Sequence, residues 1–309
     1  MSAAVAPDAR ARFRPWWPVD LRRTLGPMSR WPAMRLGASG VWRATMTRDG
    51  PATSHLALAA DGDVIMQAWG PGASWAAAAL PALVGAEDDP GGFAALAVAH
   101  PLVAELHRRM PNVRFPRTGQ VFEALVPTII EQKVTGRGAR RSYASLVRRF
   151  GPVAPGPGGP LGLRVPPAPQ QWQAIPSWEF HRAGVERRRA DTVRVAATYA
   201  HRLDESATLS GDAARARIRA LPGIGAWSAA EVAQIALGDA DAVSVGDYHI
   251  PNTVAWALAG ESRGDDARML ELLEPFRPHR GRVVRLIEAA GIGAPRFGPR
   301  MPIESIADH

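Results

Sequence analysis

The sequence predicts a mostly α-helical protein whose N-terminal part contains a small antiparallel sheet. Three observations lead to this prediction. Short alternating runs separated by turn signals occur only in the first quarter of the chain. Helical periodicity begins near Phe93 and continues to residue 290. An apolar content of 46% in 309 residues allows a large core and favours two domains.

The N-terminal part reads as a tail followed by strands and a helix. Residues 1–14 are polar and rich in Arg and Ala, so we expect a disordered tail there. Ser74–Val84 has helical character. Alternating runs predict antiparallel strands at Val41–Met46, His55–Leu58 and Val64–Trp69. We therefore expect a mixed α/β domain over residues 15–105.

The rest of the chain predicts an all-α domain over residues 106–309. Gly151–Pro169 contains seven prolines and five glycines in 19 residues, so we expect a loop or insertion over 151–170. Helical periodicity and capping signals predict helices at Phe122–Glu131, Ala139–Phe150, Arg187–Leu203, Asp212–Leu221, Ala226–Leu237, Pro251–Leu258, Ala267–Leu273 and Gly281–Ala290.

The composition excludes several kinds of site. Without cysteine there is no disulfide scaffold, thiolate zinc site, Fe–S cluster or cysteine nucleophile. No cluster of metal ligands is evident, so we expect no metal. No apolar stretch is long enough to span a membrane, and no apolar segment follows the N-terminal arginines. We therefore expect a soluble, cytoplasmic protein.

The basic charge is unevenly distributed. Lys and Arg number 37 against 29 Asp and Glu, which gives a formal net charge of +8. Residues 1–50 and 101–309 carry +6 and +7, whereas residues 51–100 carry −5 and no cation. This distribution suits a protein with one face toward a polyanion, although a solvated arginine-rich surface would explain it equally well. Lys133 is the single lysine.

The most informative local pattern is Leu-Pro-Gly-Ile-Gly at residues 221–225, followed by Ala-Trp-Ser-Ala. It joins two predicted helices through a tight Gly-x-Gly turn. Glycine permits positive φ and the close approach of another backbone. The first N–H groups of the second helix lack intrahelical partners and are biased positive by the helix dipole. Such a terminus suits a nucleic-acid phosphate, although a plain turn between helices uses similar glycines.

This segment resembles the helix–hairpin–helix of a group of DNA glycosylases, the HhH-GPD superfamily. The following loop, Val245–Ile250, is similar to the superfamily's Gly/Pro-rich loop that ends in an aspartate. Asp247 matches the catalytic aspartate of that loop. Asp239 and Asp241 are nearby carboxylates in a predicted turn, and we rank both below Asp247. The resemblance is good over residues 115–290 and rests on pattern alone over residues 15–100.

Trp227 discriminates between branches of the superfamily. In glycosylases that also cleave the strand, such as endonuclease III, a lysine at this position forms a Schiff base with the sugar. Tryptophan cannot form an imine, so the resemblance implies a monofunctional enzyme that uses water. The absence of cysteine agrees, because endonuclease III and the adenine-mismatch branch usually carry an Fe–S cluster. Trp227 resembles the pocket tryptophan of the AlkA type, DNA-3-methyladenine glycosylase II.

The resemblance implies a hydrolase of base excision repair. It would cleave the N-glycosidic bond of flipped-out alkylated bases of the 3-methyladenine and 7-methylguanine type, without AP lyase activity. The implied partner is double-stranded DNA containing damaged bases, bound by a monomer. No cofactor is implied, although a hairpin of this kind can hold a monovalent cation. The implied site residues are Asp247 for catalysis, Trp227, Glu231 and Tyr248 for the base pocket, and Gly223, Ile224, Gly225, Gln132, Lys133 and Arg137 for DNA binding.

Three positions depart from the AlkA type and leave alternatives open. Lys133 replaces an apolar wedge, and we favour a phosphate contact over a wedge. Glu231 replaces an aromatic residue one turn after Trp227, and it would either enter the pocket or face solvent. A pocket aromatic residue falls at Pro27. The remaining alternatives are the same fold acting on deaminated or oxidised bases, and a non-catalytic helix–hairpin–helix DNA-binding protein, which would gain nothing from Asp247.

Overall fold

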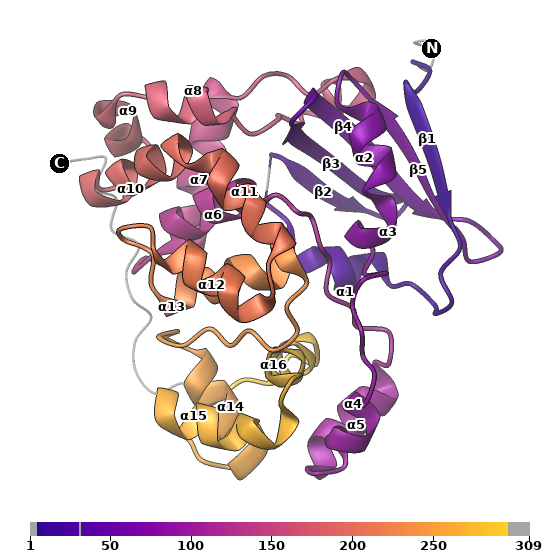
Figure 1. Ribbon diagram of the computed structural model, residues 1–309, viewed down its shortest axis with the longest axis vertical. Helices are drawn as coiled ribbons and strands as arrows, with labels where there is room; N and C mark the ends of the chain where they lie inside the picture. The colour runs from indigo at the N-terminus through magenta and orange to yellow at the C-terminus, as the bar shows by residue number, and fades with distance from the viewer. Residues whose placement is uncertain (1–4, 31, 296–309) are drawn as a thin grey trace.

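An antiparallel sheet lies at one side of the molecule and helices fill the rest (Figure 1). The computed structural model describes residues 5–30 and 32–295. The sheet has five strands in the order β1-β5-β4-β3-β2. The predicted fold class is confirmed, and the three predicted strands lie in β3, β4 and β5. The strands are β1 (Ala9–Phe13), β2 (Met34–Gly37), β3 (Gly40–Thr47), β4 (Gly50–Leu58) and β5 (Val64–Trp69).

Strand β1 corrects the expectation of a disordered tail over residues 1–14. Residues 9–13 pair antiparallel with β5, in a register that sets Ala9 opposite Ala68 and Phe13 opposite Val64. The sequence does not reveal this strand because Arg10 and Arg12 occupy the outward positions of an edge strand, where charged side chains are common. Residues 1–4 lie outside the described part of the chain.

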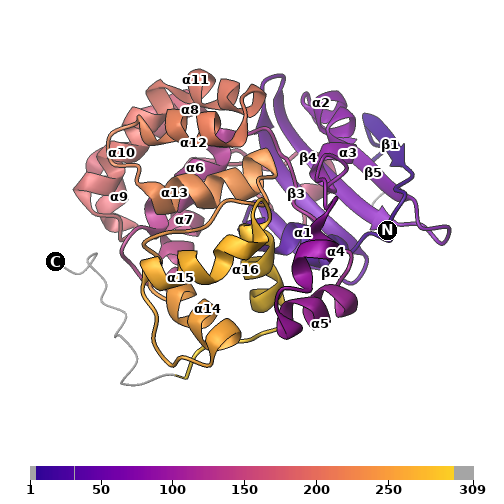
Figure 2. The same cartoon turned by 60° about the horizontal axis from the view of Figure 1, so that its bottom comes forward.

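Helices cover one face of the sheet and form the remainder of the protein (Figures 1 and 2). Within the described residues, no helix is long and apolar enough to cross a membrane. A π-helical turn, Ala233–Leu237, continues helix α13. The helices are α1 (Leu21–Leu25), α2 (Ala73–Ala78), α3 (Leu80–Leu83), α4 (Phe93–Ala97), α5 (Pro101–Arg109), α6 (Val121–Glu131), α7 (Gly136–Phe150), α8 (Pro169–Ala174), α9 (Ser177–Arg182), α10 (Arg187–Thr198), α11 (Ala200–Asp204), α12 (Gly211–Arg219), α13 (Ala226–Val232), α14 (Ile250–Ala259), α15 (Asp266–Leu273) and α16 (Arg280–Ala289).

The helices build two large apolar cores. The first gathers side chains of α6, α7, α10 and α13, including Leu125 and Val232. The second joins α4 and α5 to α14, α15 and α16, so that Phe93 and Leu106 pack with Ile287. The predicted domain boundary at residue 105 therefore falls inside α5, in a helix pair that packs with the C-terminal helices. Periodicity predicts a helix but says nothing about its partner.

The Pro- and Gly-rich segment 151–170 lies against the sheet. Leu163 and Val165 pack there with Ala44 of β3. Gly156 has φ +55°, and a Cβ at this position would lie 2.5 Å from the Trp69 ring, so only glycine fits. The predicted insertion thus connects the sheet to the helical part.

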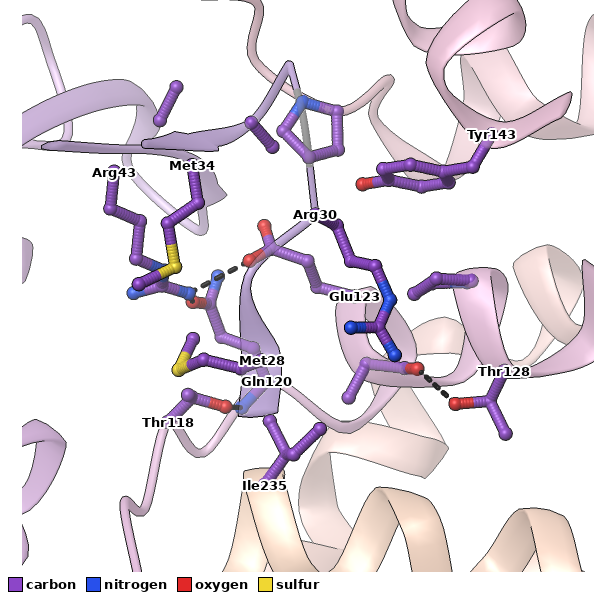
Figure 3. Close-up of a pocket in the computed structure, with 15 residues that line it drawn as sticks. Met28, Arg30, Met34, Arg43, Thr118, Gln120, Glu123, Thr128, Tyr143 and Ile235 are labelled. Atoms are coloured by element: carbon purple, nitrogen blue, oxygen red, sulfur yellow. Dashed lines mark hydrogen bonds and ion pairs between the residues drawn. The ribbon is translucent and has the colours of Figure 1, made fainter. Parts of the chain in front are cut away.

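Polar side chains line a second junction between the sheet and α6 (Figure 3). The guanidinium of Arg43 donates from Nη2 to Gln120 Oε1 at 2.6 Å and to Glu123 Oε1 at 2.8 Å. Tyr143 of α7 lines the same cavity, and burial raises the pKa of its phenol. The cavity measures about 50 Å³, which is too small for a nucleobase, so we regard it as part of the domain contact.

Candidate active site

The loop between α12 and α13 is a tight turn with several backbone N–H groups that are unbonded within the described residues. Gly223 has φ +87°, and a Cβ there would lie 2.7 Å from Thr192 Oγ1. Ile224 is buried and anchors the loop in the first core. Gly225 is exposed and extended, with open space where a Cβ would stand. The N–H groups of Gly223, Gly225 and Ala226 donate to no acceptor in the described part of the chain, so they are available to a ligand.

A second loop lies against this hairpin. Gln132 Nε2 donates to the Gly223 carbonyl at 3.0 Å and to Ser228 Oγ at 2.9 Å. The next residue, Lys133, is exposed and has φ 55°, a left-handed conformation that is unfavourable for a side chain other than glycine, asparagine or aspartate. Arg137 is exposed in the first turn of α7. The structure therefore places the predicted Gln132 beside the hairpin, with Lys133 and Arg137 following it on the surface.

Asp247 lies where α13 meets the start of α14. Its Oδ2 accepts a hydrogen bond from Trp227 Nε1 at 2.9 Å. Its Oδ1 accepts from the backbone N–H groups of His249 at 2.7 Å and Ile250 at 2.9 Å. Among residues 5–30 and 32–295, no cationic group lies within 4.0 Å of this carboxylate. The predicted pair, Trp227 and Asp247, is thus in direct contact, and no arginine neutralises the aspartate.

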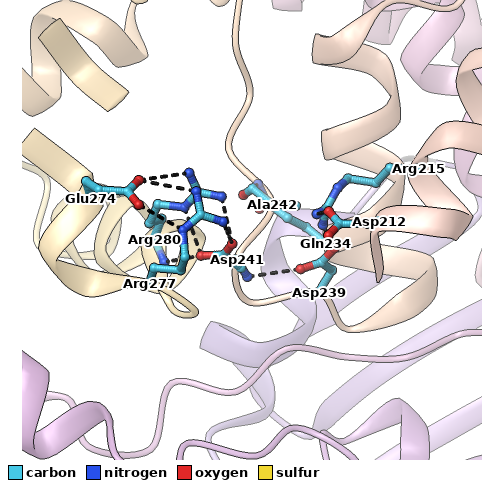
Figure 4. Close-up of polar contacts among 9 residues, drawn as sticks. All are labelled: Asp212, Arg215, Gln234, Asp239, Asp241, Ala242, Glu274, Arg277 and Arg280. Atoms are coloured by element: carbon cyan, nitrogen blue, oxygen red, sulfur yellow. Dashed lines mark hydrogen bonds and ion pairs between the residues drawn. The ribbon is translucent and has the colours of Figure 1, made fainter. Parts of the chain in front are cut away.

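Asp239 and Asp241 have a different environment (Figure 4). Asp241 accepts from Arg280 Nε at 2.9 Å and from Arg280 Nη2 at 2.7 Å. Burial alone would raise the pKa of Asp241, but the hydrogen bonds from Arg280 outweigh it and hold that pKa below its ordinary value. Asp239 forms an ion pair with Arg215. Asp239 therefore ties the loop to α12, and Asp241 ties it to α16.

A cavity of about 210 Å³ opens beside α13. Glu231 lines this cavity, and its place in the base pocket stays a prediction. Ser244 Oγ donates to Glu231 Oε1 at 2.5 Å, and burial raises the pKa of Glu231 to about 7. The residues that line the cavity are Pro27, Glu231, Gln234, Ile235, Ile250, Val284, Arg285 and Glu288.

Tyr248 and Trp227, both predicted for the base pocket, do not line this cavity. The Tyr248 side chain points away from it. This side chain is 82% exposed and packs edge-on against His249, with ring centroids 4.9 Å apart. The physical reason is the turn at Asp247. Because the Asp247 carboxylate points inward to accept from the start of α14, the adjacent side chain points outward.

The polar wall of the cavity, formed by Gln234, Arg285 and Glu288, was not predicted from the sequence. A signal was present. Arg285 and Glu288 are three residues apart on a helix that is otherwise apolar around them, and the same spacing relates Glu231 to Gln234. Such pairs lie on one face of a helix, and polar pairs on a core-facing side indicate a site.

Comparison with known sequences gives a partial match. No family model matches the chain. A protein of Mycobacterium tuberculosis described as "Probable bifunctional transcriptional activator/DNA repair enzyme AlkA" is 29% identical over 169 residues. The match covers 53% of this chain and 33% of that protein, so the chain spans about a third of the length of the curated relatives it matches.

Comparison with solved structures shows the fold. A 3-methyladenine DNA glycosylase from Archaeoglobus fulgidus superimposes with a TM-score of 0.74 at 18% identity, covering 89% of this chain and 96% of that one. An 8-oxoguanine glycosylase/lyase from Clostridium acetobutylicum gives a TM-score of 0.69 at 11% identity, covering 92% and 98%. The chain has the fold of these enzymes over nearly its full length. The resemblance predicted from the sequence is confirmed at that level.

Proposed function

We propose that this protein is a monofunctional DNA glycosylase that hydrolyses the N-glycosidic bond of alkylated bases in double-stranded DNA. The observation that carries the proposal is the contact between Trp227, which follows the exposed hairpin in α13, and Asp247. The curated relative's repair role and the first solved neighbour's action on 3-methyladenine support the same reading. Asp247, which has no cationic partner among the described residues, disfavours a purely DNA-binding protein, because a carboxylate near phosphates weakens binding.

DNA binding is assigned to the hairpin and the loop beside it. The free N–H groups of Gly223 and Gly225 would donate to one backbone phosphate, as helix N-termini commonly do. Gln132 holds the neighbouring loop in place through its contacts with Gly223 and Ser228. Lys133 and Arg137 would then contact the flanking phosphates. We propose that the hairpin can also hold a monovalent cation, and we propose no other cofactor.

The damaged base must rotate out of the DNA duplex to reach the cavity, since a stacked base is inaccessible. We place it beside Trp227, whose indole attracts the positive charge of an N-alkylated purine by ~1–2 kcal/mol when water is excluded. The same positive charge makes the base a good leaving group. The reaction therefore needs no general acid for alkylated substrates.

Bond cleavage leaves an electron-poor, oxocarbenium-like sugar. Asp247 would stabilise that developing charge and orient the attacking water, the electrostatic role that carboxylates have in glycoside hydrolysis. Trp227 stands where a strand-cleaving enzyme has its lysine, and Lys133 lies on a different loop. We therefore propose that water is the nucleophile and that the strand stays intact. Among the described residues, no group of three His, Cys, Asp or Glu could hold a metal ion.

A second candidate function keeps the mechanism and changes the base. The cavity wall is more polar than an alkylpurine pocket requires, since it contains Glu231, Gln234 and Arg285. A neutral deaminated or oxidised base would use such groups for hydrogen bonding. In either case we expect a monomeric enzyme that acts in the cytoplasm. Sedimentation of the purified protein measures its oligomeric state.

The test is a base-release assay. Duplexes with one 3-methyladenine, 7-methylguanine, hypoxanthine or 8-oxoguanine are incubated with the protein, and the free base and the strand are analysed separately. We expect release of the methylated bases, an uncleaved strand before alkali treatment and no adduct after borohydride. A borohydride-trapped protein–DNA adduct would contradict the monofunctional mechanism. Failure to release any base would reject the glycosylase proposal.

A further inference from the structure

We infer that Arg285 is a specificity-determining residue whose free N–H donates to the carbonyl oxygen at C6 of the flipped purine. The inference rests on the proposed function and narrows it. It selects 6-oxopurines over 6-aminopurines, whether the 6-oxopurine arises from alkylation of guanine or from deamination of adenine.

Arg285 is a buried cation whose guanidinium makes one hydrogen bond within the described residues. Its side chain is 5% exposed and lines the cavity. Nη2 donates to Gln234 Oε1 at 3.1 Å, and the guanidinium lies 4.1 Å from the centroid of the Phe115 ring. Nη1 is buried and has no acceptor in the part of the chain that the structure describes. A buried donor without an acceptor is unfavourable, so an acceptor on a ligand would be bound there.

Two other buried arginines of this protein have carboxylate partners, whereas Arg114, also buried, donates to the Asp88 backbone carbonyl and has no carboxylate partner among the described residues. Arg282, three residues earlier on α16, pairs with Asp88 at 2.5 Å. Arg43 pairs with Glu123 at 2.8 Å. For Arg285, no carboxylate oxygen lies within 4.0 Å among the described residues. The guanidinium of Arg285 therefore forms no ion pair within the described residues. Burial lowers its pKa to about 10, so it stays protonated at neutral pH.

The neighbouring groups hold Arg285 in a fixed orientation. Gln234 Nε2 donates to the Ala242 carbonyl at 3.1 Å, which directs the other atom of the amide, Oε1, toward Arg285 (Figure 4 shows Gln234 and Ala242). Phe115 covers the guanidinium face. Nη2 and one face of the guanidinium are thus occupied, and we infer that Nη1, which has no partner among the described residues, is the donor offered to the cavity.

Glu231 supplies the complementary group on the wall of the same cavity. A 6-oxopurine presents an acceptor, O6, beside a donor, N1–H. Arg285 would donate to O6 while Glu231 accepts from N1–H. A 6-aminopurine presents a donor and an acceptor in the reverse order, so its amino group would face Arg285 and both donors would lack acceptors. Undamaged guanine has the same edge, but its uncharged ring leaves far more slowly than 7-methylguanine.

The experiment compares substrates within one variant. Arg285→Met removes the donors and keeps an apolar side chain of similar length. Single-turnover rates of base release are measured on duplexes containing 7-methylguanine, 3-methyladenine or hypoxanthine. We expect the ratio of the 7-methylguanine rate to the 3-methyladenine rate to fall about tenfold or more, which is the effect of a lost hydrogen bond to a buried charged group. Partial unfolding lowers both rates alike and leaves this ratio unchanged.

A matched control is Arg114→Met. Arg114 is also buried but does not line the cavity, so this variant should keep the wild-type ratio. An unchanged ratio in Arg285→Met would overturn the inference while leaving the glycosylase proposal standing. Release of none of these bases by the wild-type protein would reject the proposed function itself. If the wild type releases hypoxanthine, its rate should fall with that of 7-methylguanine, and an unaffected hypoxanthine rate would also overturn the inference.

Discussion

The two ends of the loop between α13 and α14 carry the same kind of side chain in opposite settings. At its start, Asp239 and Asp241 form ion pairs with Arg215 and Arg280. At its end, Asp247 accepts hydrogen bonds only from uncharged N–H groups in the described residues. A carboxylate that is paired with arginine is committed to holding the loop. A carboxylate without a cation remains available to a positive charge brought by the substrate.

The largest expected effect is a loss of base-release rate when Asp247, the carboxylate without a cationic partner in the described residues, is replaced. Asp247→Asn should lower the single-turnover rate of base release by about 10²–10³-fold, because it removes the charge that stabilises the electron-poor sugar. The amide keeps an oxygen for the N–H groups of His249 and Ile250, so α14 should still form. Asp241→Asn is the matched control, and it should lower the melting temperature and leave the rate of base release within about threefold. Equal rate losses in the two variants would show that the two carboxylates do not differ in role.

The next effect concerns the buried acid of the cavity. Burial raises the pKa of Glu231 to about 7 from its ordinary value of 4.5. Between these pH values the folded protein binds a proton that the unfolded chain releases, so its free energy of unfolding falls as the pH rises, by up to about 3 kcal/mol.

Glu231→Gln keeps the hydrogen bond with Ser244 and removes this titration. Denaturant unfolding of the wild type and the variant at pH 5 and pH 8 gives the free energy of unfolding at each pH. The change in this free energy between pH 5 and pH 8 should be smaller in the variant. Asp204, whose pKa burial also raises, contributes equally to both proteins, whereas Glu288 interacts with Glu231 and belongs to the measured difference. Identical pH dependence in the wild type and the variant would contradict a buried Glu231.

A smaller effect separates the two glycines of the hairpin. Gly223→Ala places a Cβ 2.7 Å from Thr192 Oγ1 at φ +87°, and it should destabilise the fold by about 1–3 kcal/mol. Gly225→Ala meets nothing within 4 Å and should leave the free energy of unfolding nearly unchanged. It should nevertheless weaken binding to duplex DNA several-fold, because the added methyl group obstructs the phosphate. Wild-type DNA affinity in Gly225→Ala would place the phosphate elsewhere.

The smallest effect decides between the two roles of Lys133. Lys133→Asn removes the charge and tolerates the left-handed backbone. A phosphate contact predicts a few-fold loss of affinity and a salt dependence of binding that is shallower by about one in log–log slope. A wedge predicts unchanged salt dependence and slower base release at saturating protein. Titrations at several salt concentrations, with the single-turnover rate measured alongside, distinguish these outcomes.

Much of the molecule follows from local sequence. The hairpin glycines and the strands β3 to β5 could be predicted because turn chemistry and alternation act over a few residues. The first strand could not, because its arginines replace the apolar alternation that identifies a strand. The packing of α5 on α16 could not be predicted either, since a helical period does not identify the surface that covers it.

The candidate site also contains residues that local sequence predicts and residues that it does not. Asp247 and Trp227 could be found because each belongs to a recognisable local motif, and the structure brings them into hydrogen-bond contact. The outward direction of Tyr248 depends on how Asp247 turns the chain. The polar wall formed by Gln234 and Arg285 depends on two helices distant in sequence that meet at one cavity.

The most direct test of the central claim is the affinity for two abasic-site analogues, one with a cationic pyrrolidine in place of the sugar and one with a neutral tetrahydrofuran. Because Asp247 is proposed to stabilise a positive sugar, the wild-type protein should bind the cationic analogue at least about tenfold more tightly, as expected for a mimic of the transition-state charge. Asp247→Asn should lose most of that preference and keep its affinity for the neutral analogue. An equal preference in both proteins would contradict the role assigned to Asp247.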